Sequence, residues 1–253
     1  MEFERIADIK RLNFIIATLR TRLPEGAEVL DVGCGNGVIS RSLGEKGFLV
    51  KGIDVSEKAI QKARNLNKFS NVSFEVVSAE QLVADGHRYH AVICSEVLEH
   101  LNDPGKLLRV LNQSLHQDGI LIVTVPNGKG PRELFVTRPV IAMKKKNNWT
   151  WKLVSGVKKL FGYKGTTVQS DADDLTHIQF FTKKSLEQLA GANEFRIRQF
   201  GKTNFVEDVF PFSLLTKRIK ALQKLDCAVA ELLPYQFTGG FVSVWERRDA
   251  KLP

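Results

Sequence analysis

Short apolar runs alternate with amphipathic stretches through the first half of the chain. In the amphipathic stretches apolar residues recur every three to four positions, the spacing of a helix that buries one face. Strands that alternate with helices predict a parallel sheet covered by helices on both faces. The predicted strands are 28–32, 48–54, 72–77, 90–95 and 119–125, and the predicted helices are 5–22, 37–46, 56–68 and one that begins near Gly105.

Two segments interrupt this pattern in the second half. Residues 129–175 are basic, aromatic-bearing and irregular, and residues 204–235 contain a helix that Pro234 ends. Between and after them the pattern continues in a helix at 181–190 and strands at 195–200 and 241–245. We therefore predict a single domain, residues 1–253, with two insertions near the carboxyl ends of strands. In open α/β sheets this edge binds ligands.

Composition adds a question about charge. The 253 residues have ordinary globular composition, but 37 Lys and Arg against 28 Asp and Glu give a net charge of +9. Residues 129–164 hold ten of the basic residues and one acidic residue, Glu133, so the rest of the chain is balanced. The charge is therefore a property of the first insertion.

Several protein classes are excluded by simple features of the sequence. No apolar run approaches the roughly 18 residues of a membrane-spanning helix, and the N-terminus lacks the layout of a signal peptide. Three widely spaced cysteines favour neither a disulfide framework nor a zinc site. These features predict a cytoplasmic protein.

A glycine cluster carries the strongest chemical signal. Gly33, Gly35 and Gly37 follow the first predicted strand, with Asp31 before them and Asp54 at the end of the next strand. Glycines at a strand-to-helix turn let the backbone approach a ligand, and an acidic residue about twenty positions on can accept hydrogen bonds from ribose hydroxyls. The spacing is GxGxG, because the third glycine of a dinucleotide fingerprint would fall at Val38. The glycines could also serve the turn alone.

These residues resemble the class I S-adenosylmethionine (SAM) methyltransferases, and three further segments strengthen the resemblance. Cys94–Leu101 is similar to the E-x-L-E-H stretch of the ubiquinone-biosynthesis O-methyltransferase family. Arg11–Ile15 and His177–Thr182 resemble other recurring segments of that family. The resemblance covers roughly residues 5–128 and 176–200. It implies a Rossmann-like, doubly wound sheet of seven strands with the last strand antiparallel, and SAM as cofactor with S-adenosylhomocysteine (SAH) as product.

The resemblance also implies which residues bind SAM. Those near its methionyl part would be Gly33, Cys34, Gly35, Ser95 and Glu96, with Arg11 pairing its carboxylate and Asp31 supporting the loop. Asp54 would hold the ribose, and Val55, Ala79 and Glu80 would flank adenine. Glu80 departs from the family, in which an Asp is common. Two alternatives stay open: Cys34 could be a packing residue, and Arg11 could be a solvated helix residue.

Two histidines are candidates for the general base that a hydroxyl acceptor requires. His100 lies one turn past Glu96, where the transferred methyl group should project, and His177 borders the first insertion. His100 could instead have a structural role. Glu96, Glu99 and His100 could share a cation, but nothing in the sequence requires one, and we predict no metal.

These residues predict a SAM-dependent methyltransferase that acts on an oxygen of a small or lipid-linked acceptor. N-methylation of a small amine or sugar, and a SAM-binding regulatory protein without turnover, are the alternatives. The sequence argues against nucleic-acid substrates, because the fourth strand is not followed by the Pro-Pro-aromatic motif that stacks a flipped base. The basic insertion has three interpretations: a solvated flap, a lid over an anionic acceptor, or a peripheral contact of residues 144–161 with anionic lipid.

Overall fold

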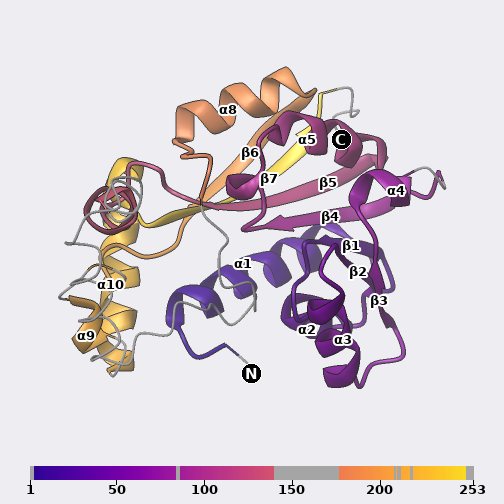
Figure 1. Ribbon diagram of the computed structural model, residues 1–253, viewed down its shortest axis with the longest axis horizontal. Coiled ribbons are helices and arrows are strands. Elements are labelled where there is room, and N and C mark those ends of the chain that lie inside the picture. Colours follow the sequence, from indigo (N-terminus) through magenta and orange to yellow (C-terminus); the bar gives the residue numbers. More distant parts are fainter. Residues whose placement is uncertain are drawn as a thin grey trace.

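The computed structural model describes residues 3–83, 86–139, 177–207, 209, 212–216 and 219–248. These form a mixed sheet of seven strands with the order β3-β2-β1-β4-β5-β7-β6 (Figure 1). The strands are β1 (Glu28–Val32), β2 (Leu49–Asp54), β3 (Val72–Val76), β4 (Tyr89–Ser95), β5 (Leu115–Pro126), β6 (Phe195–Lys202) and β7 (Gly240–Arg247).

The direction of the strands follows the prediction. The first five strands pair in parallel, whereas β7 is antiparallel to both of its neighbours, β5 and β6. The α/β fold with an antiparallel last strand is therefore confirmed. Because β1 and β4 are neighbours, the chain reverses its direction of progress across the sheet between β3 and β4, which opens a ligand crevice beside the carboxyl ends of these strands.

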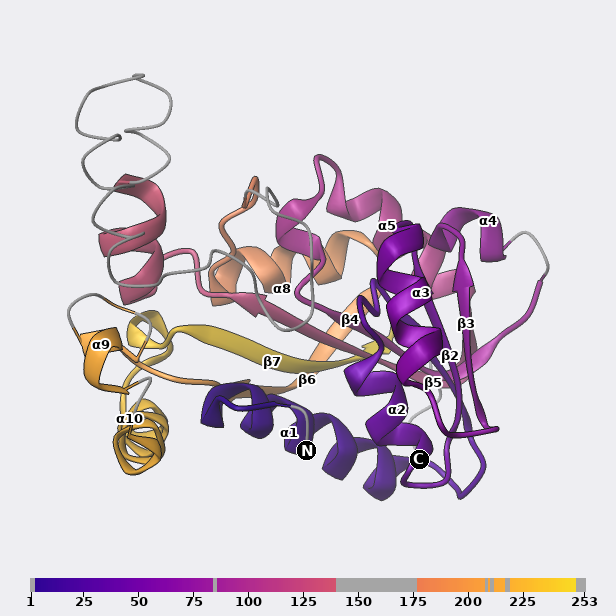
Figure 2. The same cartoon turned by 60° about the horizontal axis from the view of Figure 1, so that its bottom comes forward.

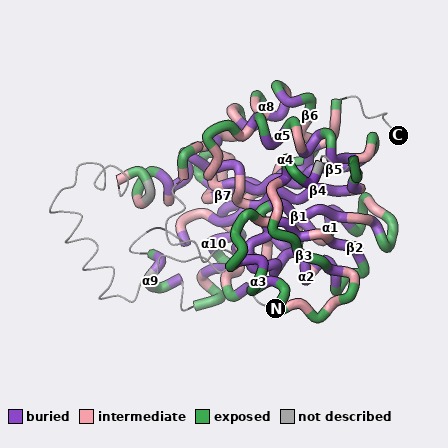
Figure 3. Tube along the Cα trace, turned by 45° about the vertical axis from the view of Figure 1, so that its right-hand side comes forward, coloured by how far each residue is buried: buried purple, intermediate pink, exposed green. Residues whose placement is uncertain are grey.

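Helices cover both faces of the sheet. On one face lie α1 (Ile6–Arg22), α2 (Val38–Gly44) and α3 (Glu57–Leu66), and on the other lie α4 (Ala79–Val83), α5 (Pro104–Gln113) and α8 (Lys183–Ala192). Adjacent residues of β5 point to opposite faces of the sheet. Ile120 and Ile122 pack toward α1, whereas Leu121 and Val123 pack toward α5 and α8. The strands are buried between exposed outer surfaces (Figure 3).

The helix predicted in the second insertion is two helices in the structure. A short α9 (Phe212–Thr216) precedes α10 (Lys220–Leu232), which packs against α1 at the far side of the molecule from β3 (Figure 2). The side-chain amide of Gln223 in α10 links this helix to α1 and α9. Its oxygen accepts from the amide of Ile6 in α1 at 2.9 Å, and its nitrogen donates to the carbonyl of Thr216 in α9 at 2.8 Å.

The structure differs from the prediction in three other places. The α4 helix was not predicted, because a five-residue helix is too short to show a period. The fifth strand begins at Leu115 rather than 119, since Leu115 pairs with Tyr89 before a register shift in the ladder. Residues 131–139 at the start of the first insertion are helical, including a π-helical turn Glu133–Thr137, where the sequence indicated irregular structure. The rest of that insertion, 140–175, lies outside the described residues.

None of the helices in the described part of the chain is long and apolar enough to cross a membrane.

Candidate active site

The glycine loop between β1 and α2 needs glycine for its own geometry. Gly33, Gly35 and Gly37 have φ of +67°, +54° and +75°, a region that other residues enter at a cost. A Cβ at Gly33 would lie 2.5 Å from Cγ2 of Val97, and one at Gly37 would meet the ring of Phe74. Gly33 is also exposed at the carboxyl edge of the sheet. The loop therefore offers bare backbone where a ligand can approach.

Asp54 at the end of β2 is tied to that loop. One carboxylate oxygen accepts from the amide of Gly35 at 3.0 Å, and the other accepts from the amide of Ser56 at 2.8 Å. The side chain is only partly buried, and a carboxylate oxygen can accept more than one hydrogen bond. Asp54 can therefore order the loop and still accept hydrogen bonds from a ligand.

Asp31 lies beneath the loop and is 1% exposed. Burial raises the pKa of its carboxyl to about 7, although the hydroxyl of Ser40, which donates to it at 2.6 Å, opposes that shift. The nearby charge of Asp54 raises it further. Asp31 therefore gains its charge only as the pH approaches neutrality, and it contacts α2 from below the loop, as a supporting residue should.

Cys34 within the loop and Cys94 in β4 are both buried. Burial is the main cause that raises the pKa of each thiol far above its usual value. Since the thiolate is the nucleophilic form, neither cysteine is prepared for nucleophilic chemistry. This agrees with the interpretation of Cys34 as a packing residue.

The residues predicted to flank adenine lie next to each other along the edge but differ in exposure. Val55 is 76% exposed, whereas Ala79 at the start of α4 is buried. The carboxylate of Glu80 lies on the surface, 3.7 Å from Nζ of Lys106. A surface ion pair of this kind holds the side chain weakly, so Glu80 is not fixed by its surroundings.

A chain of polar contacts crosses the carboxyl ends of β4 and β5. The hydroxyls of Ser95 and Thr124 are 2.9 Å apart, and Thr124 donates to Oε1 of Glu96 at 2.9 Å. Because Thr124 has a single hydroxyl hydrogen, Ser95 is the donor in the first contact. Glu96 has φ of +58°, which turns the chain out of β4, and its Oε1 lies 3.7 Å from Nη1 of Arg11.

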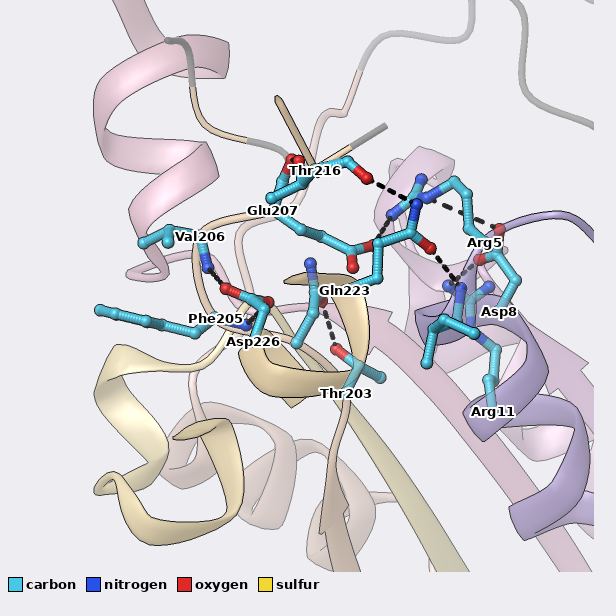
Figure 4. A network of polar contacts seen from close by, with 12 residues as sticks. Arg5, Asp8, Arg11, Thr203, Phe205, Val206, Glu207, Thr216, Gln223 and Asp226 are labelled. Atoms are coloured by element: carbon cyan, nitrogen blue, oxygen red, sulfur yellow. Dashed lines mark hydrogen bonds and ion pairs between the residues drawn. The ribbon is translucent and has the colours of Figure 1, made fainter. Parts of the chain in front are cut away.

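Arg11 of α1 is thereby brought to the sheet edge, and a wider network places it there (Figure 4). Its Nη2 lies 3.3 Å from Asp8, which also contacts Arg5, and Arg5 pairs with the buried carboxylate of Glu207 at 2.9 Å. The buried Nε of Arg11 has no hydrogen-bond partner among the described residues. A guanidinium with unused donor capacity beside exposed loop backbone fits a ligand that carries a carboxylate, as SAM does.

The same network anchors the second insertion. The carboxylate of Asp226 in α10 accepts from the amides of Phe205 and Val206 at 2.7 and 2.8 Å (Figure 4). These backbone groups lie two residues or fewer before Glu207. The second insertion and the start of α1 therefore jointly support Arg11, a connection that their separation in the sequence conceals.

The two candidate bases lie next to each other, with their ring planes tilted by 59°. The ring centroids of His100 and His177 are 5.2 Å apart, and both side chains are mostly buried. The backbone carbonyl of Glu99 holds the segment before α8 in place, since it accepts from the amides of Ile178 and Gln179 at 2.8 and 2.9 Å. The turn after β4 and the segment that follows the first insertion thus meet at this point.

Each histidine has a buried glutamate beside it. His177 Nδ1 lies 3.2 Å from Oε1 of Glu133, and His100 Nε2 lies 3.8 Å from Oε1 of Glu99. Both glutamates are 1% exposed. Burial, and next the charge of Glu96, raise the pKa of Glu99 well above its usual value.

Glu133 was not among the predicted site residues. It lies 44 positions before His177, and within the described residues neither of its oxygens has a hydrogen-bond partner, although His177 Nδ1 lies within ion-pair distance of Oε1. One signal was available: Glu133 is the only acidic residue in the basic segment 129–164. An isolated acid in such a segment indicates a specific partner.

The cluster also bears on the prediction of no metal. One ligand atom each of Glu99, His100 and His177 lies within 4.8 Å of the others. His177 thus takes the place that the sequence suggested for Glu96. Carboxylate and imidazole are suitable metal ligands, so the residues of the cluster could hold a cation, and the expected absence of a metal stays a prediction.

A matched pair of glycine substitutions separates backbone strain from loop crowding. Gly33→Ala should lower both stability and SAM affinity, because it combines φ of +67° with the contact to Val97. Gly26→Ala has φ of +74° with nothing within 4 Å of its Cβ, so it should cost only about 1 kcal/mol of unfolding free energy. Thermal unfolding and calorimetry with SAM measure both effects. Equal stability and equal SAM affinity of the two variants would show that the contact with Val97 affects neither property.

The strand order, the antiparallel β7 and the glycine loop at the carboxyl edge define a class I SAM-dependent methyltransferase. The methyltransferase domain family matches residues 4–199, and the chain belongs to that family. This confirms the resemblance on which the predicted residues depend.

Individual relatives agree with this class. The chain is 34% identical over 138 residues to the ubiquinone biosynthesis O-methyltransferase of Neisseria meningitidis serogroup C, a match that covers 52% of this chain and 56% of that protein. The chain spans about half the length of the curated relatives it matches.

Two solved structures share the fold. The SAH complex of magnesium protoporphyrin IX methyltransferase from Synechocystis PCC 6803 has a TM-score of 0.57 at 20% identity, over 96% of this chain and 84% of that one. The cyclase SpnF has a TM-score of 0.55 at 16% identity, over 93% of this chain and 81% of that one. The fold thus also occurs in a protein named for another reaction.

Proposed function

We propose that this protein transfers the methyl group of SAM to a hydroxyl oxygen of a small or lipid-linked acceptor. The observation that carries the proposal is the pair of neighbouring histidines with buried glutamates, close to the carboxyl end of β4. A hydroxyl acceptor needs a base near the transition state. The relatives named ubiquinone biosynthesis O-methyltransferase support oxygen as the acceptor atom.

In this proposal the carboxyl edge of the sheet binds SAM. The loop Gly33–Gly35 approaches the methionyl part with Asp31 as its support, and Arg11 pairs the carboxylate of the cofactor, with Ser95 and Glu96 beside it. Asp54 accepts hydrogen bonds from the ribose. Val55, Ala79 and Glu80 flank adenine. The unused donor on Arg11 and the exposed backbone of the loop support this assignment.

SAM supplies a methyl group on a sulfonium, which needs no further activation. The chain supplies orientation and a base. In this proposal Glu133, whose Oε1 lies 3.2 Å from Nδ1 of His177, holds the ring proton on Nδ1 and leaves the lone pair of Nε2 available. Nε2 of His177 would take the hydroxyl proton as the acceptor oxygen bonds to the methyl carbon, and the electron pair of the broken carbon–sulfur bond would stay on the sulfur. His100 is the second candidate for the same role.

An acceptor comparison tests the choice of oxygen. Release of SAH from SAM is measured with a catechol and with an aromatic amine of the same ring. Faster turnover with the catechol, and a methyl ether as its product, is the expected result. Preference for the amine would favour the alternative of N-methylation. Binding of SAM without turnover on either acceptor class would favour a regulatory or binding role, which the fold alone permits.

A metal-assisted version of the reaction is the second candidate, favoured by the cluster of Glu99, His100 and His177. A cation there would polarise the acceptor hydroxyl directly. Dialysis against a chelator distinguishes this metal-assisted reaction from one that uses an imidazole base alone. Unchanged turnover supports the imidazole base and the predicted absence of a metal, whereas a loss that a divalent cation restores would assign the cluster to a metal.

We also propose that residues 129–175 and 204–235 are insertions of one methyltransferase domain spanning 1–253, with the first insertion over the acceptor. Its residues 144–161, predicted to contact anionic lipid, lie outside the described residues. The helical start of the insertion supports lipid contact, because it exposes Phe135 (71%) and Leu134 (42%) beside basic residues.

Sedimentation with lipid vesicles tests this contact. Binding to vesicles that contain phosphatidylserine should exceed binding to neutral vesicles and should fall as salt rises, because the lysines act through screened charge. Phe135→Ser should weaken binding, while the control Leu49→Ser, 47% exposed at the start of β2, should not. If no salt-sensitive binding occurs, the insertion is a solvated flap or a lid over an anionic acceptor.

A further inference from the structure

All five histidines of the chain fall into two clusters, one of which the proposed function does not use. His87, His90 and His116 lie at the amino ends of β4 and β5, at the opposite edge of the sheet from the glycine loop. Glu28, the first residue of β1, lies with them.

Strand register explains why these side chains meet. Val29 pairs with Ala91, so Glu28 lies beside His90. Tyr89 pairs with Leu115, so His116 lies on the other side of His90. Three neighbouring parallel strands therefore each begin with a metal-ligating side chain in one lateral row.

The distances match a shared ligand. One ligand atom each of Glu28, His90 and His116 lies within 4.8 Å of the other two, and the rings of His90 and His116 have centroids 4.7 Å apart. A fourth group is close, since His87 Nε2 lies 3.3 Å from Oε2 of Glu28. All four residues are partly or fully exposed, so an ion can reach them from solvent.

We propose that Glu28, His90 and His116, with His87 as a fourth ligand, form a site for a divalent transition-metal cation, with Zn²⁺ as its best occupant. Three imidazoles and one carboxylate suit the tetrahedral geometry and ligand preference of Zn²⁺. Mg²⁺ is excluded by the same chemistry, because it prefers oxygen ligands in an octahedral arrangement.

One contact within the cluster bears on binding. His90 Nδ1 accepts from the amide of Glu28 at 3.1 Å. That acceptor bond fixes the ring in place, and a bound cation would replace it, leaving the amide at the exposed strand end to water.

The bound cation would act as a structural clamp. It would join the amino ends of β1, β4 and β5, whose carboxyl ends carry Asp31, Ser95 and Thr124. Because it lies at the opposite edge of the sheet, the site is independent of the proposed methyl transfer.

Calorimetric titration of the full chain with Zn²⁺, after removal of metals, tests the site. The wild-type protein should show one saturable step that His116→Gln and His90→Gln each weaken by at least about 10-fold, the lower limit seen even for groups that only support a ligand. The control His100→Gln alters the other cluster and should retain this step. Titration with Mg²⁺ should show no such step.

A stability measurement accompanies the titration. Zn²⁺ should raise the Tm of the wild-type protein and of His100→Gln, but not of His116→Gln, since only binding to the folded state stabilises it. Circular dichroism without metal checks that the variants fold. The proposal is overturned if the wild-type protein binds no Zn²⁺ saturably, or if His116→Gln and His90→Gln bind it with wild-type affinity.

Discussion

Asp54→Ala is expected to weaken SAM binding by at least about 100-fold, the largest effect on affinity of any single change. The variant loses two hydrogen bonds from ribose hydroxyls to a charged acceptor, worth about 1.5–3 kcal/mol each. It also frees the amide of Gly35, which Asp54 holds at 3.0 Å, so the glycine loop loses an anchor. Calorimetry with SAM and with SAH measures both affinities.

Two controls belong with this change. Glu57→Gln alters an exposed carboxylate three residues further along and should bind SAM normally. Asp54→Asn keeps one side-chain oxygen as an acceptor but lacks the charge. Its affinity for SAM should therefore lie between those of Asp54→Ala and the wild-type protein. If Asp54→Ala is folded and binds SAM as the wild-type protein does, the ribose assignment is wrong.

His177→Gln is expected to lower kcat by about 100-fold or more while leaving the Kd of SAM unchanged. General base catalysis contributes about 10²–10⁴ in rate, and the proposal puts the imidazole at the acceptor end of the site rather than at the nucleotide end. His100→Gln is measured alongside, because the two rings are 5.2 Å apart and either could face the acceptor. The larger loss of kcat identifies the base.

Glu133 provides the test of how His177 is positioned. Glu133→Gln can donate a hydrogen to Nδ1 of His177, which would place the proton on Nε2 and remove the base. The kcat of Glu133→Gln should therefore fall as that of His177→Gln does. The double variant should have a kcat no lower than that of the slower single variant. Additive losses, or a Glu133→Gln variant with normal kcat, would contradict the pairing seen at 3.2 Å.

The sheet could be predicted almost completely from the sequence, for a physical reason. Strands buried on both faces are mostly apolar, so the runs 91–94 and 120–125 stand out. The glycine loop was equally visible, because positive φ at Gly33, Gly35 and Gly37 requires that residue. Both features are local properties of the chain.

The missed features depend on contacts between distant residues. Glu133 acquires its role only because the segment before α8 folds back onto the start of the first insertion. Arg11 was predicted to reach the cofactor, but the network through Arg5 and Glu207 that supports it joins residues about 200 positions apart. His90 and His116 meet only through the register of β4 and β5.

The most direct test of the proposed active site is a crystal structure of the protein with SAH. We predict that the ribose lies on Asp54, the carboxylate of SAH on Arg11, and the sulfur facing His100 and His177 across a space that can hold an acceptor. If SAH binds elsewhere, or with its sulfur turned away from the two histidines, the proposed active site is wrong.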